Sequence, residues 1–471
     1  MYVVFGVIAT GFDARYLYTK YFSSLEDVLE FALDRGDPKP ACDTIDRKLS
    51  ESQLSAEQQF LVAHSTRSYY GSTQLLDVGG EPIWVVNEGE YCMLNTLDLS
   101  VDQMFWELDL NPWVVRNILD QFVRHYSYVD ELKTRDGQIR PGGISFCHDM
   151  GAYNTFSPRG YSSYELPNLD ALCFSYMTSE QLCNWILIAS TYVRHTGDVN
   201  WARQNDAVLS ACLESLRNRC GGTGLVAFDS TRCETGSEIT TYDSLDHSLA
   251  SARDSLYMAV KAWASAVGLA ALFCQLGHPD KAKEAHALAK QSVTALASVS
   301  EGDGILPAVL DRASSGYRSR ILPACEGLLY PYLWGIDLAK DWTDLYELIR
   351  NHVVALLKDR DCRNLFPDGG IRLSSTSSNS WMSKIALFQE LARGLFDLHG
   401  DPDLAALLDR ADCAHVRWQI EGSGYWACSD QFVDGVAKGS RYYPRIITTA
   451  LWLSTHFRKS AAPCQAQVTA V

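Results

Sequence analysis

Apolar residues recur at three- and four-residue spacing through most of the chain, the pattern of helices that bury one face. This pattern predicts about ten consecutive helical segments and therefore a mainly α fold. A further short helix is predicted from Ser24, a residue type typical of N-caps, through Leu33. The predicted segments cover residues 55–70, 101–126, 179–195, 203–217, 252–275, 279–299, 342–357, 380–398, 402–419 and 444–457.

The two ends of the chain depart from the helical pattern. Tyr2–Ile8 and Tyr16–Phe22 are rich in β-branched and aromatic residues, which predicts two short strands. Lys459–Val471 is rich in Ala, Gln and Pro without periodicity, which predicts a disordered tail. We therefore expect strands within residues 1–22, one helical domain over 23–458 and a tail over 459–471.

Long connections rich in Gly, aromatic and acidic residues separate the predicted helices. Loops of this length are uncommon in a compact domain unless they carry function. Helix pairs alternating with such loops predict an α/α toroid whose loops form a pocket at one end. An irregular helical array is the structural alternative, because the sequence holds no strong internal repeat. The connections are 84–98, 139–170, 221–248, 301–332, 364–380 and 421–442.

The charge balance argues against nucleic acid as a partner. The chain has 41 basic and 57 acidic residues, a net charge of −16, and such a surface repels phosphate backbones. The same charge also serves solubility. The apolar start Met1–Phe12 has no basic leader and is too short to span a bilayer, so we expect no membrane partner and a cytoplasmic location.

The fourteen cysteines occur singly, and no CxxC pair is present. This spacing favours free thiols in a reducing compartment over a disulfide framework, with zinc as the weaker alternative. Most of them are expected to behave as small buried hydrophobes in apolar helical settings. Examples are Cys183, Cys212, Cys274 and Cys413.

Motifs for nucleotide binding and for zinc proteases are absent, since the chain has no GxxxxGK[ST], no GxGxxG after a strand and no HExxH. Cys147-His148-Asp149 could supply metal ligands, yet no partner cluster with metal spacing accompanies it. A supporting or substrate-binding role is therefore favoured for His148 and Asp149. We predict no metal and no cofactor.

Two loops hold carboxylates among aromatic and small polar residues. One contains Glu88 and Glu90, and the other contains Asp243 and Asp246. Glycoside hydrolysis needs this combination: one carboxylic acid protonates the leaving oxygen while a second carboxylate attacks the anomeric carbon or activates water. Acidic loop residues also serve as helix caps or solvated charges, and either aspartate could cap the following helix. The residues alone leave sugar hydrolysis as one hypothesis among several.

Several long runs resemble β-xylosidases of glycoside hydrolase family 52, from about residue 14 to about residue 455. Trp, Asn, Gly and Asp stand in fixed order in these runs, so the resemblance is far more specific than a short motif. The runs are WVVNEGEYCMLNTLDLSVDQMFWELDLNPW (84–113), PGGISFCHDMG (141–151), SSYEL (162–166), FDSTR (228–232), EITTYDSLD (238–246), LFPDGGIRLSSTSSNSW (365–381), ADCAHVRW (411–418) and RYYPR (441–445).

The resemblance implies a retaining, exo-acting β-xylosidase with an (α/α)6 barrel, acting on xylo-oligosaccharides. The family's nucleophile is the first glutamate of the NEGEY segment, which is Glu88 here. Its acid/base is the aspartate of the TTYDSLD segment, which is Asp243. Glu90 and Asp246 are the neighbours on which a shifted register would place these roles. In the free enzyme we expect Asp243 to be protonated and Glu88 to be ionised.

The resembling loops also supply candidates to bind sugar hydroxyls or to stack on the ring. For each of them taken singly, core packing or local loop bonding is at least as good an interpretation. Trp426, in a Gly-rich segment, is the preferred sugar platform. The candidates are Asn87, His148, Asp149, Asp368, Trp381, Trp426 and Asp430.

One departure from the family concerns residues 1–22. Family members carry a large β-sandwich before the barrel, so these residues resemble its last strands. Strands without sheet partners leave unpaired backbone groups. We therefore expect either a truncated product of reduced solubility and stability or a chain whose strand face is covered by a partner, such as a second copy.

Two alternative functions remain: a barrel that binds xylo-oligosaccharide with little or no turnover, and another retaining exo-glycosidase such as a β-glucosidase.

Overall fold

The computed structural model describes residues 14–35, 39–165, 177–233, 237–246, 249–299, 304–361 and 363–453. Helices make up most of this part of the chain, so the mainly α prediction is confirmed. The predicted tail over 459–471 and the predicted strand Tyr2–Ile8 lie outside the described residues.

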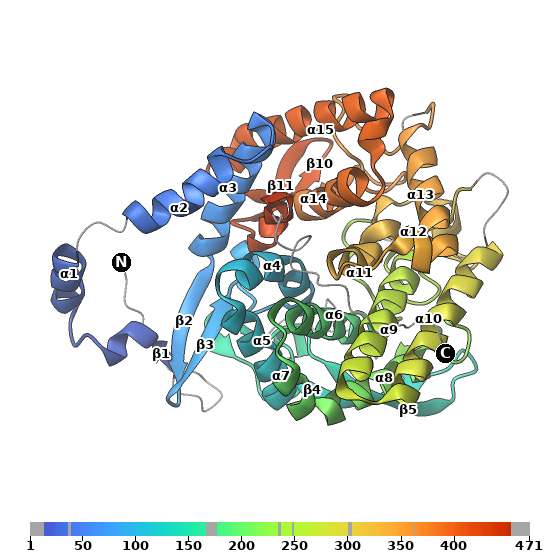
Figure 1. Ribbon diagram of the computed structural model, residues 1–471, viewed down its shortest axis with the longest axis horizontal. Helices are drawn as coiled ribbons and strands as arrows, with labels where there is room; N and C mark the ends of the chain where they lie inside the picture. The colour runs from blue at the N-terminus through green and yellow to red at the C-terminus, as the bar shows by residue number, and fades with distance from the viewer. Residues whose placement is uncertain are drawn as a thin grey trace.

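Six segments form a ring around the centre of the molecule (Figure 1). Each packs against the next, and the last segment of the chain returns to the first. Segments far apart in the sequence therefore face one another across the ring. In chain order the six are α4 (Leu97–Leu110), α6 (Thr178–Thr196), α9 (Leu256–Leu276), the 3-10 segment η7 (Leu322–Leu328), α14 (Met382–Glu390) and the 3-10 segment η11 (Pro444–Leu453).

A second layer of helices packs on the outside of this ring (Figure 1). An (α/α)6 barrel has an inner ring with an outer ring around it, and the barrel stays our prediction for this fold. The outer contacts are α3 (Ala56–Gly71) on η11, α5 (Pro112–His125) on α4, α8 (Asp206–Cys220) on α6, α10 (Pro279–Val299) on α9 and α13 (Thr343–Leu357) on η7, with α15 (Pro402–Ile420) against α3.

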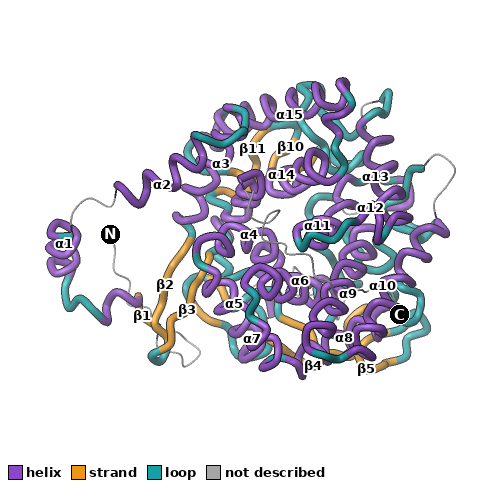
Figure 2. Tube along the Cα trace, in the orientation of Figure 1, coloured by secondary structure: helices purple, strands orange, loops and turns teal. Residues whose placement is uncertain are grey.

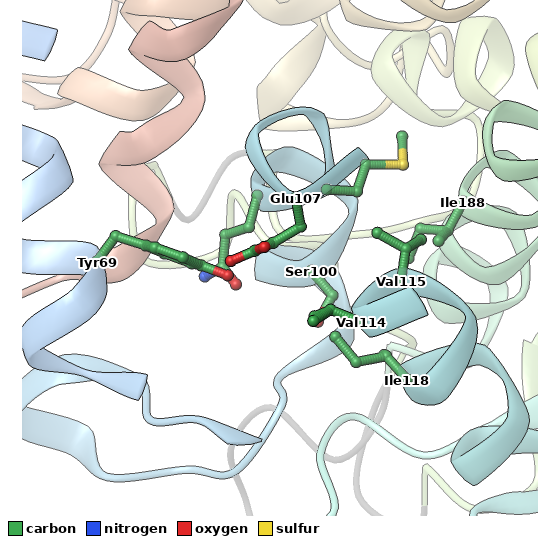
Figure 3. A pocket seen from close by; sticks show the side chains of 9 residues that line it. Tyr69, Ser100, Glu107, Val114, Val115, Ile118 and Ile188 are labelled. Carbon is green, nitrogen blue, oxygen red and sulfur yellow. The ribbon is translucent and has the colours of Figure 1, made fainter. Parts of the chain in front are cut away.

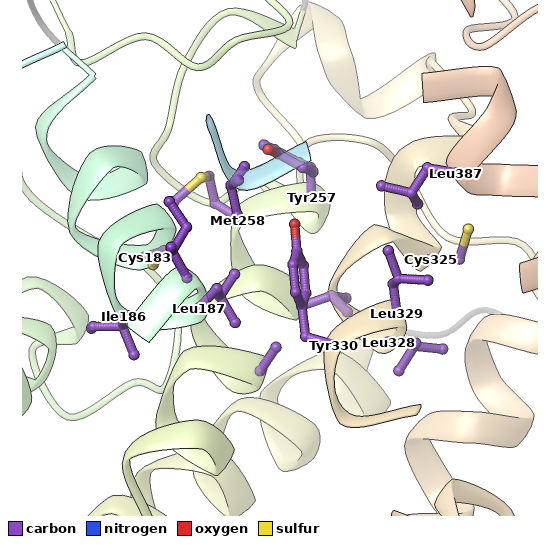
Figure 4. Close-up of a cluster of buried hydrophobic side chains, with 14 of the residues drawn as sticks. Cys183, Ile186, Leu187, Tyr257, Met258, Cys325, Leu328, Leu329, Tyr330 and Leu387 are labelled. Carbon is purple, nitrogen blue, oxygen red and sulfur yellow. The ribbon is translucent and has the colours of Figure 1, made fainter. Parts of the chain in front are cut away.

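The hydrophobic core lies between the ring and its outer layer. Trp185, Trp201 and Trp263 are among its largest fully buried side chains. Figure 4 shows one part of it, where apolar residues of α6, α9, η7 and the short α11 (Leu329–Leu333) meet. Helix α9 is long and apolar enough to cross a membrane, but 94% of its most apolar window is buried inside the structure. This degree of burial is typical of a helix in the core of a globular protein.

Short sheets carry several of the loops that the sequence indicated (Figure 2). Strand β1 (Ala14–Tyr16) pairs antiparallel with β2 (Thr73–Val78), which pairs with β3 (Glu81–Val86). The predicted strand Tyr16–Phe22 is instead mostly the 3-10 turn Leu17–Lys20. The remaining strands are β4 (Ser127–Lys133), β5 (Ile139–Phe146), β6 (Gly151–Ala152), β7 (Thr155–Phe156), β8 (Asp229–Ser230), β9 (Asn379–Trp381), β10 (Ser429–Val433) and β11 (Val436–Arg441).

The predicted helix over 101–126 is two helices, α4 and α5, with Asn111 between them. Pro112 has no N–H and occupies the first turn of α5, where no intrahelical donor is needed. The N-terminal helix α1 (Leu25–Asp34) begins as predicted at Ser24, whose hydroxyl accepts from the Asp27 N–H. No residue of α1 is buried, and Figure 1 shows the helix apart from the ring. Short helices complete the fold: α2 (Lys39–Ser50), α7 (Val199–Gln204) and α12 (Leu338–Asp341).

The cysteines whose state the structure describes are free thiols. Cys183 and Cys212 are buried, as the sequence pattern predicted. Cys274 is only half-buried and Cys413 is exposed, so for Cys413 the prediction of a buried thiol is wrong. Helix periodicity places Cys413 on the solvent side of α15, beside Asp412 and Ala414, which face the core.

Candidate active site

The beginnings of the six ring segments bring ionisable side chains to the same end of the ring. Ion pairs join α4 to α14, α14 to η7, η7 to α9 and α9 to α6, while η11 reaches α4. Each of these residues is at most 4% exposed, so the charges face one another rather than solvent. The set comprises Asp98 and Asp102 of α4, Glu180 of α6, Lys261 of α9, Glu326 of η7, Lys384 of α14 and Arg445 of η11.

Glu88 lies beside this cluster, two residues after the end of β3. Its N–H donates to the Met93 carbonyl at 2.8 Å, which folds the segment back on itself. The half-buried carboxylate accepts hydrogen bonds from Thr96 Oγ1 at 2.5 Å and from the Tyr443 hydroxyl at 2.6 Å. Burial raises the pKa of Glu88, while the nearby charge of His148 acts in the opposite direction. Glu88 is thus a carboxylate held at a fixed place by two donors.

The backbone around Glu88 adopts conformations that side chains other than glycine rarely adopt. Cys92, Asn95 and Tyr442 have φ values of 57°, 50° and 52°. Each such residue costs on the order of 1 kcal/mol or more, and they gather at functional sites. Gly89 packs against the 441–442 backbone so closely that an added Cβ would lie 2.4 Å from the Arg441 carbonyl oxygen. The loop therefore depends on close backbone approach next to Glu88.

His148 supplies a positive charge next to Glu88. Its Nδ1 lies 2.9 Å from Asp149 Oδ2, and its Nε2 lies 3.5 Å from Asp98 Oδ1. Burial alone would lower the pKa of His148, but the hydrogen bond with Asp149 and the charges of Asp98, Asp149 and Glu88 raise it to about 9. The imidazole is therefore protonated at neutral pH.

The side chain of Asp149 is fully buried and contacts His148. Its Oδ1 accepts from the N–H groups of Gly151 at 2.8 Å and Ser163 at 2.9 Å. Its Oδ2 accepts from Ser163 Oγ at 3.0 Å besides meeting His148. All lone-pair directions of this buried carboxylate are used. Asp149 fixes the orientation of the imidazole.

Asp98 connects the Glu88 side of the cluster to the loop that carries Asp243. Its Oδ2 accepts from Thr241 Oγ1 at 3.0 Å, and Arg445 Nη1 lies 3.8 Å away. Although burial acts to raise it, the pKa of Asp98 is lowered by the charges of His148 and Arg445. An ionised Asp98 thus stands between two cations, and its partner Thr241 is two residues before Asp243 in the chain.

Asp243 lies on a turn in which its N–H donates to the Thr240 carbonyl at 3.1 Å. The side chain is half-buried, and its Oδ1 accepts from the Ser244 N–H at 2.5 Å. Asp246, the neighbour that a shifted register would choose, accepts from Ser374 Oγ at 3.0 Å and from Thr376. Glu90, the corresponding neighbour of Glu88, is exposed.

Comparison with known proteins finds similarity to one family of glycoside hydrolases. Residues 2–192 match the family model for Glycosyl hydrolase family 52. A β-xylosidase of Geobacillus stearothermophilus is 45% identical over 460 residues, which is 95% of this chain and 64% of the relative. Over the region that it spans, the chain is similar to members of glycosyl hydrolase family 52. A second β-xylosidase of that organism is 44% identical over 274 residues, 57% of this chain and 44% of the relative.

The structure brings most of the predicted sugar-binding residues to the same cluster. Asn87 adjoins Glu88, with its side-chain amide donating to the Ser72 carbonyl at 3.2 Å. Asp430 accepts from Arg445 Nη2 at 2.8 Å and from the Ser383 N–H at 2.7 Å. Arg445 lies over the Trp381 ring, 4.9 Å from its centroid. His148, Asp149, Trp381 and Asp430 are therefore linked to one another through Asp98 and Arg445.

Two predicted residues lie apart from these contacts. Asp368 accepts from the Gly370 N–H at 3.0 Å and from Trp418 Nε1 at 2.7 Å, which ties its loop to α15. Trp426 is 72% exposed and stands edge-on to Tyr425. An exposed indole of this kind is what a sugar platform requires.

The cavity in Figure 3 lies elsewhere, between α3, α4 and α5. It has about 10 Å³ of space, roughly the room that one water molecule needs. Tyr69, Ser100, Gln103 and Glu107 contribute its polar lining, and apolar residues such as Val114 and Ile118 form the remainder. Its size restricts it to a hydration site.

The sequence patterns did not indicate Thr96, Asp98, Tyr443 and Arg445 as members of the candidate site. Asp98 and Asp102 stand four residues apart in a largely buried helix, a spacing that puts two charges on one face. Such a pair in a buried helix is a detectable signal. Tyr443 and Arg445 stand in the RYYPR run, but only the closure of the ring shows that they reach Glu88 and Asp98.

Proposed function

We propose that this chain is a retaining, exo-acting β-xylosidase that removes terminal β-1,4-xylosyl residues from xylo-oligosaccharides. The observation that carries the proposal is the half-buried carboxylate of Glu88, fixed by the hydroxyls of Thr96 and Tyr443 beside a protonated His148. The similarity to two β-xylosidases supports xylose as the sugar. The chain spans 64% of the length of the first of them, so its activity is part of the proposal.

In the first step Glu88 is the nucleophile and Asp243 is the acid. A carboxylate oxygen of Glu88 forms a bond to the anomeric carbon while the bond from that carbon to the leaving oxygen breaks. Asp243 donates its proton to the leaving oxygen, which departs as an alcohol. The products of the step are a covalent α-xylosyl ester on Glu88 and an ionised Asp243.

In the second step Asp243 acts as the base. It takes a proton from a water molecule, whose oxygen attacks the anomeric carbon while the bond to Glu88 breaks. Xylose leaves with its original β configuration, Asp243 is protonated again and Glu88 is again a carboxylate. This double displacement requires the two carboxyl groups to stand roughly 5 to 5.5 Å apart.

The groups around Glu88 support its part in both steps. The hydroxyls of Thr96 and Tyr443 stabilise the carboxylate by charge-assisted hydrogen bonds, which are about twice as strong as neutral ones. His148 adds a fixed positive charge held by Asp149 and Asp98. These groups keep Glu88 ionised although burial favours the protonated form.

We further propose that the sugar is held by residues of the same end of the ring, without metal or cofactor. Asn87, His148, Trp381 and Asp430 are the candidates at the reacting sugar, and Asp149 contributes by fixing the orientation of His148. Trp426 is proposed to stack on a sugar further from the reacting bond, because it is exposed. Asp368 is proposed to contribute through the loop that it holds against α15.

The proposal is tested by hydrolysis of 4-nitrophenyl β-xyloside by the purified chain, beside Glu88→Ala with and without azide. We expect activity in the parent, a loss of several orders of magnitude in Glu88→Ala and its recovery by azide with formation of α-xylosyl azide. Azide replaces the missing carboxylate as nucleophile, so an α product identifies both the nucleophile and the retaining mechanism. Glu90→Ala is the matched control, because Glu90 is exposed next to the same loop.

Other outcomes separate the alternatives. A folded parent without activity that still binds xylotriose would favour a binding function. Preference for the 4-nitrophenyl β-glucoside would contradict the assignment of xylose. An active Glu88→Ala would move the nucleophile to another carboxylate.

A further inference from the structure

Five buried ionic side chains meet inside the ring beneath the loop of Asp243. Lys384 Nζ lies 2.7 Å from Asp102 Oδ2 and 2.9 Å from Glu326 Oε1. Lys261 Nζ lies 3.1 Å from Glu180 Oε1 and 3.5 Å from Glu326 Oε1. Each of these residues is at most 2% exposed. Glu326 receives both lysines and is the centre of the network.

Stability alone does not account for such a network. Burying each ion costs several kcal/mol after relaxation, and well-packed apolar replacements of buried ion pairs are often neutral or stabilising. Buried polar networks that are fully satisfied do fix a unique arrangement of the groups bound to them. The role of this network therefore depends on which groups it binds.

The network binds the two residues that precede Asp243. The Tyr242 hydroxyl donates to Glu326 Oε2 at 2.9 Å, and the Thr241 N–H donates to Glu180 Oε2 at 2.7 Å. Although burial acts in the opposite direction, the charges of Lys384 and Lys261 lower the pKa of Glu326 to about 2. Glu326 is therefore an acceptor only, and Tyr242 must be the donor.

Ring contacts fix the remaining freedom of Tyr242. Its ring is stacked on Trp381, with centroids 5.3 Å apart and planes 13° apart, and it meets Tyr257 edge-on at 4.8 Å. The hydrogen bond from the Tyr242 hydroxyl to Glu326 fixes the orientation of the ring between Trp381 and Tyr257. Because Asp243 follows Tyr242 directly and lies on a turn, its carboxyl group moves with the Tyr242 backbone.

We propose that Glu326, acting through Tyr242, is a positioning residue for the acid/base carboxyl of Asp243. This proposal rests on the function proposed above. General acid catalysis requires the proton to be within hydrogen-bond reach of the leaving oxygen, and misplacement of about 1 Å can cost roughly 10²-fold in rate. The network inside the ring thus determines where the proton is delivered.

The test compares leaving groups, because only poor leaving groups need the proton. Tyr242→Phe removes one hydroxyl and keeps the ring and its stacking on Trp381. On 4-methoxyphenyl β-xyloside, a poor leaving group, we expect kcat/KM to fall by on the order of 10-fold or more, within the ~10²–10⁴-fold that general acid catalysis supplies. On 2,4-dinitrophenyl β-xyloside, a good leaving group, we expect a fall of less than about 3-fold, since little protonation is required there.

A second readout uses the base role of Asp243. With the dinitrophenyl substrate, breakdown of the covalent intermediate limits kcat, and this step needs Asp243 to activate water. We expect kcat of Tyr242→Phe to be reduced and then raised by azide, which needs no base, with β-xylosyl azide as product. A change that only loosens the fold would not respond to azide.

The matched control is Tyr330→Phe. Tyr330 is as buried as Tyr242 and lies in the same core, where Figure 4 shows it near Tyr257. Its hydroxyl makes no hydrogen bond to a described residue, so it does not hold the loop of Asp243. We expect kcat/KM of Tyr330→Phe to stay within about 2-fold of the parent on both substrates, because this change leaves the position of the Asp243 carboxyl group unaltered.

The outcomes separate this proposal from the proposed function. An inactive parent on both substrates would contradict the function itself. An active parent with Tyr242→Phe equally impaired on both substrates, or unimpaired on both, would overturn the positioning role and leave the function standing. Glu326→Gln is a second variant, expected to show the same selective loss on the methoxyphenyl substrate if it folds.

Discussion

The hydroxyl of Tyr443 lies 2.6 Å from a carboxylate oxygen of Glu88, although 355 positions separate the two residues in the chain. Tyr443 directly precedes η11, the last segment of the ring, and Glu88 precedes α4, the first. Closure of the ring therefore completes the environment of Glu88. Burial raises the pKa of Tyr443 well above its usual range, so its hydroxyl is a donor at all working pH values.

Tyr443→Phe is expected to raise the pKa of Glu88 further, because it removes a donor that stabilises the ionised form. A hydrogen bond to a charged group is worth about 1.5–3 kcal/mol, which corresponds to about one pKa unit or more. The acid limb of the kcat/KM profile should therefore move to higher pH by about one unit, with roughly 10-fold lower activity at its acidic end. A pH–rate series with an aryl xyloside measures this shift. Tyr126→Phe is the control, because the Tyr126 hydroxyl donates to the Ser157 carbonyl at 3.3 Å and not to Glu88. An acid limb at the same pH in Tyr443→Phe and in the parent would contradict the prediction.

His148→Gln should move the same acid limb in the same direction. The charge of His148 lowers the pKa of Glu88, so a neutral side chain at position 148 lets that pKa rise. Glutamine can still donate to Asp149, which separates loss of charge from loss of the hydrogen bond. A profile identical to that of the parent would mean that the imidazolium has no effect on Glu88.

His148 also predicts how stability depends on pH. Its pKa is raised from 6.5 to about 9 in the folded chain, so its contribution to stability is fully present below about pH 6.5 and is lost as pH rises through about 9. Thermal denaturation of the parent should therefore show a decline in Tm across that window. The difference between parent and His148→Gln isolates this group from others that titrate, and a constant difference from pH 6 to pH 9.5 would count against it.

The helical pattern predicted most of the ring, because burial of one face leaves a periodic trace in the sequence. It also placed the N-cap at Ser24 correctly. It could not predict which charged residues are buried: Asp98 and Lys261 read as ordinary polar positions until the ring closes around them. Short strands such as β10 and β11 were predicted only as loops, since five or six residues between turns leave too little alternation to detect.

Candidate site residues could be predicted where they stand close together in one loop. They could not be predicted where segments far apart in the sequence meet. The resemblance predicted roles for Glu88, His148 and Asp430, but the contacts of Glu88 with Tyr443 and of Asp98 with Thr241 join segments more than 140 residues apart. Such pairs leave no local pattern. Asp368 illustrates the opposite limit, since a loop aspartate that bonds Gly370 and Trp418 has the same sequence character as one that binds sugar.

Lys384→Met is expected to destabilise the fold by about 3–5 kcal/mol, because it leaves Asp102 as an uncompensated buried carboxylate and Glu326 with Lys261 alone. Urea denaturation at pH 7 measures the loss. The loss should shrink toward pH 5, where the carboxylates can take up protons, and Asp102 does so first because its pKa is already raised to about 6 by burial. Lys358→Met is the control: its ion pair with Asp401 is on the surface, where such pairs contribute about 0–1 kcal/mol. Equal losses in the two variants would show that the buried network is no more important than a surface pair.

Trp426→Ala tests whether the exposed indole binds sugar. The side chain is 72% exposed, so its removal should change the free energy of unfolding by no more than about 0.5 kcal/mol. Aromatic stacking contributes about 0.5–1.5 kcal/mol, so KM for xylotriose should rise by roughly 2- to 10-fold while KM for an aryl xyloside with a single sugar stays unchanged. Trp113→Ala is the matched control, because Trp113 is also partly exposed, at 44%, but packs against Trp84 at the start of α5. Equal KM values for xylotriose in the parent and in Trp426→Ala would remove Trp426 from the binding site, whereas a rise that is confined to the longer substrate would place a second sugar over its ring.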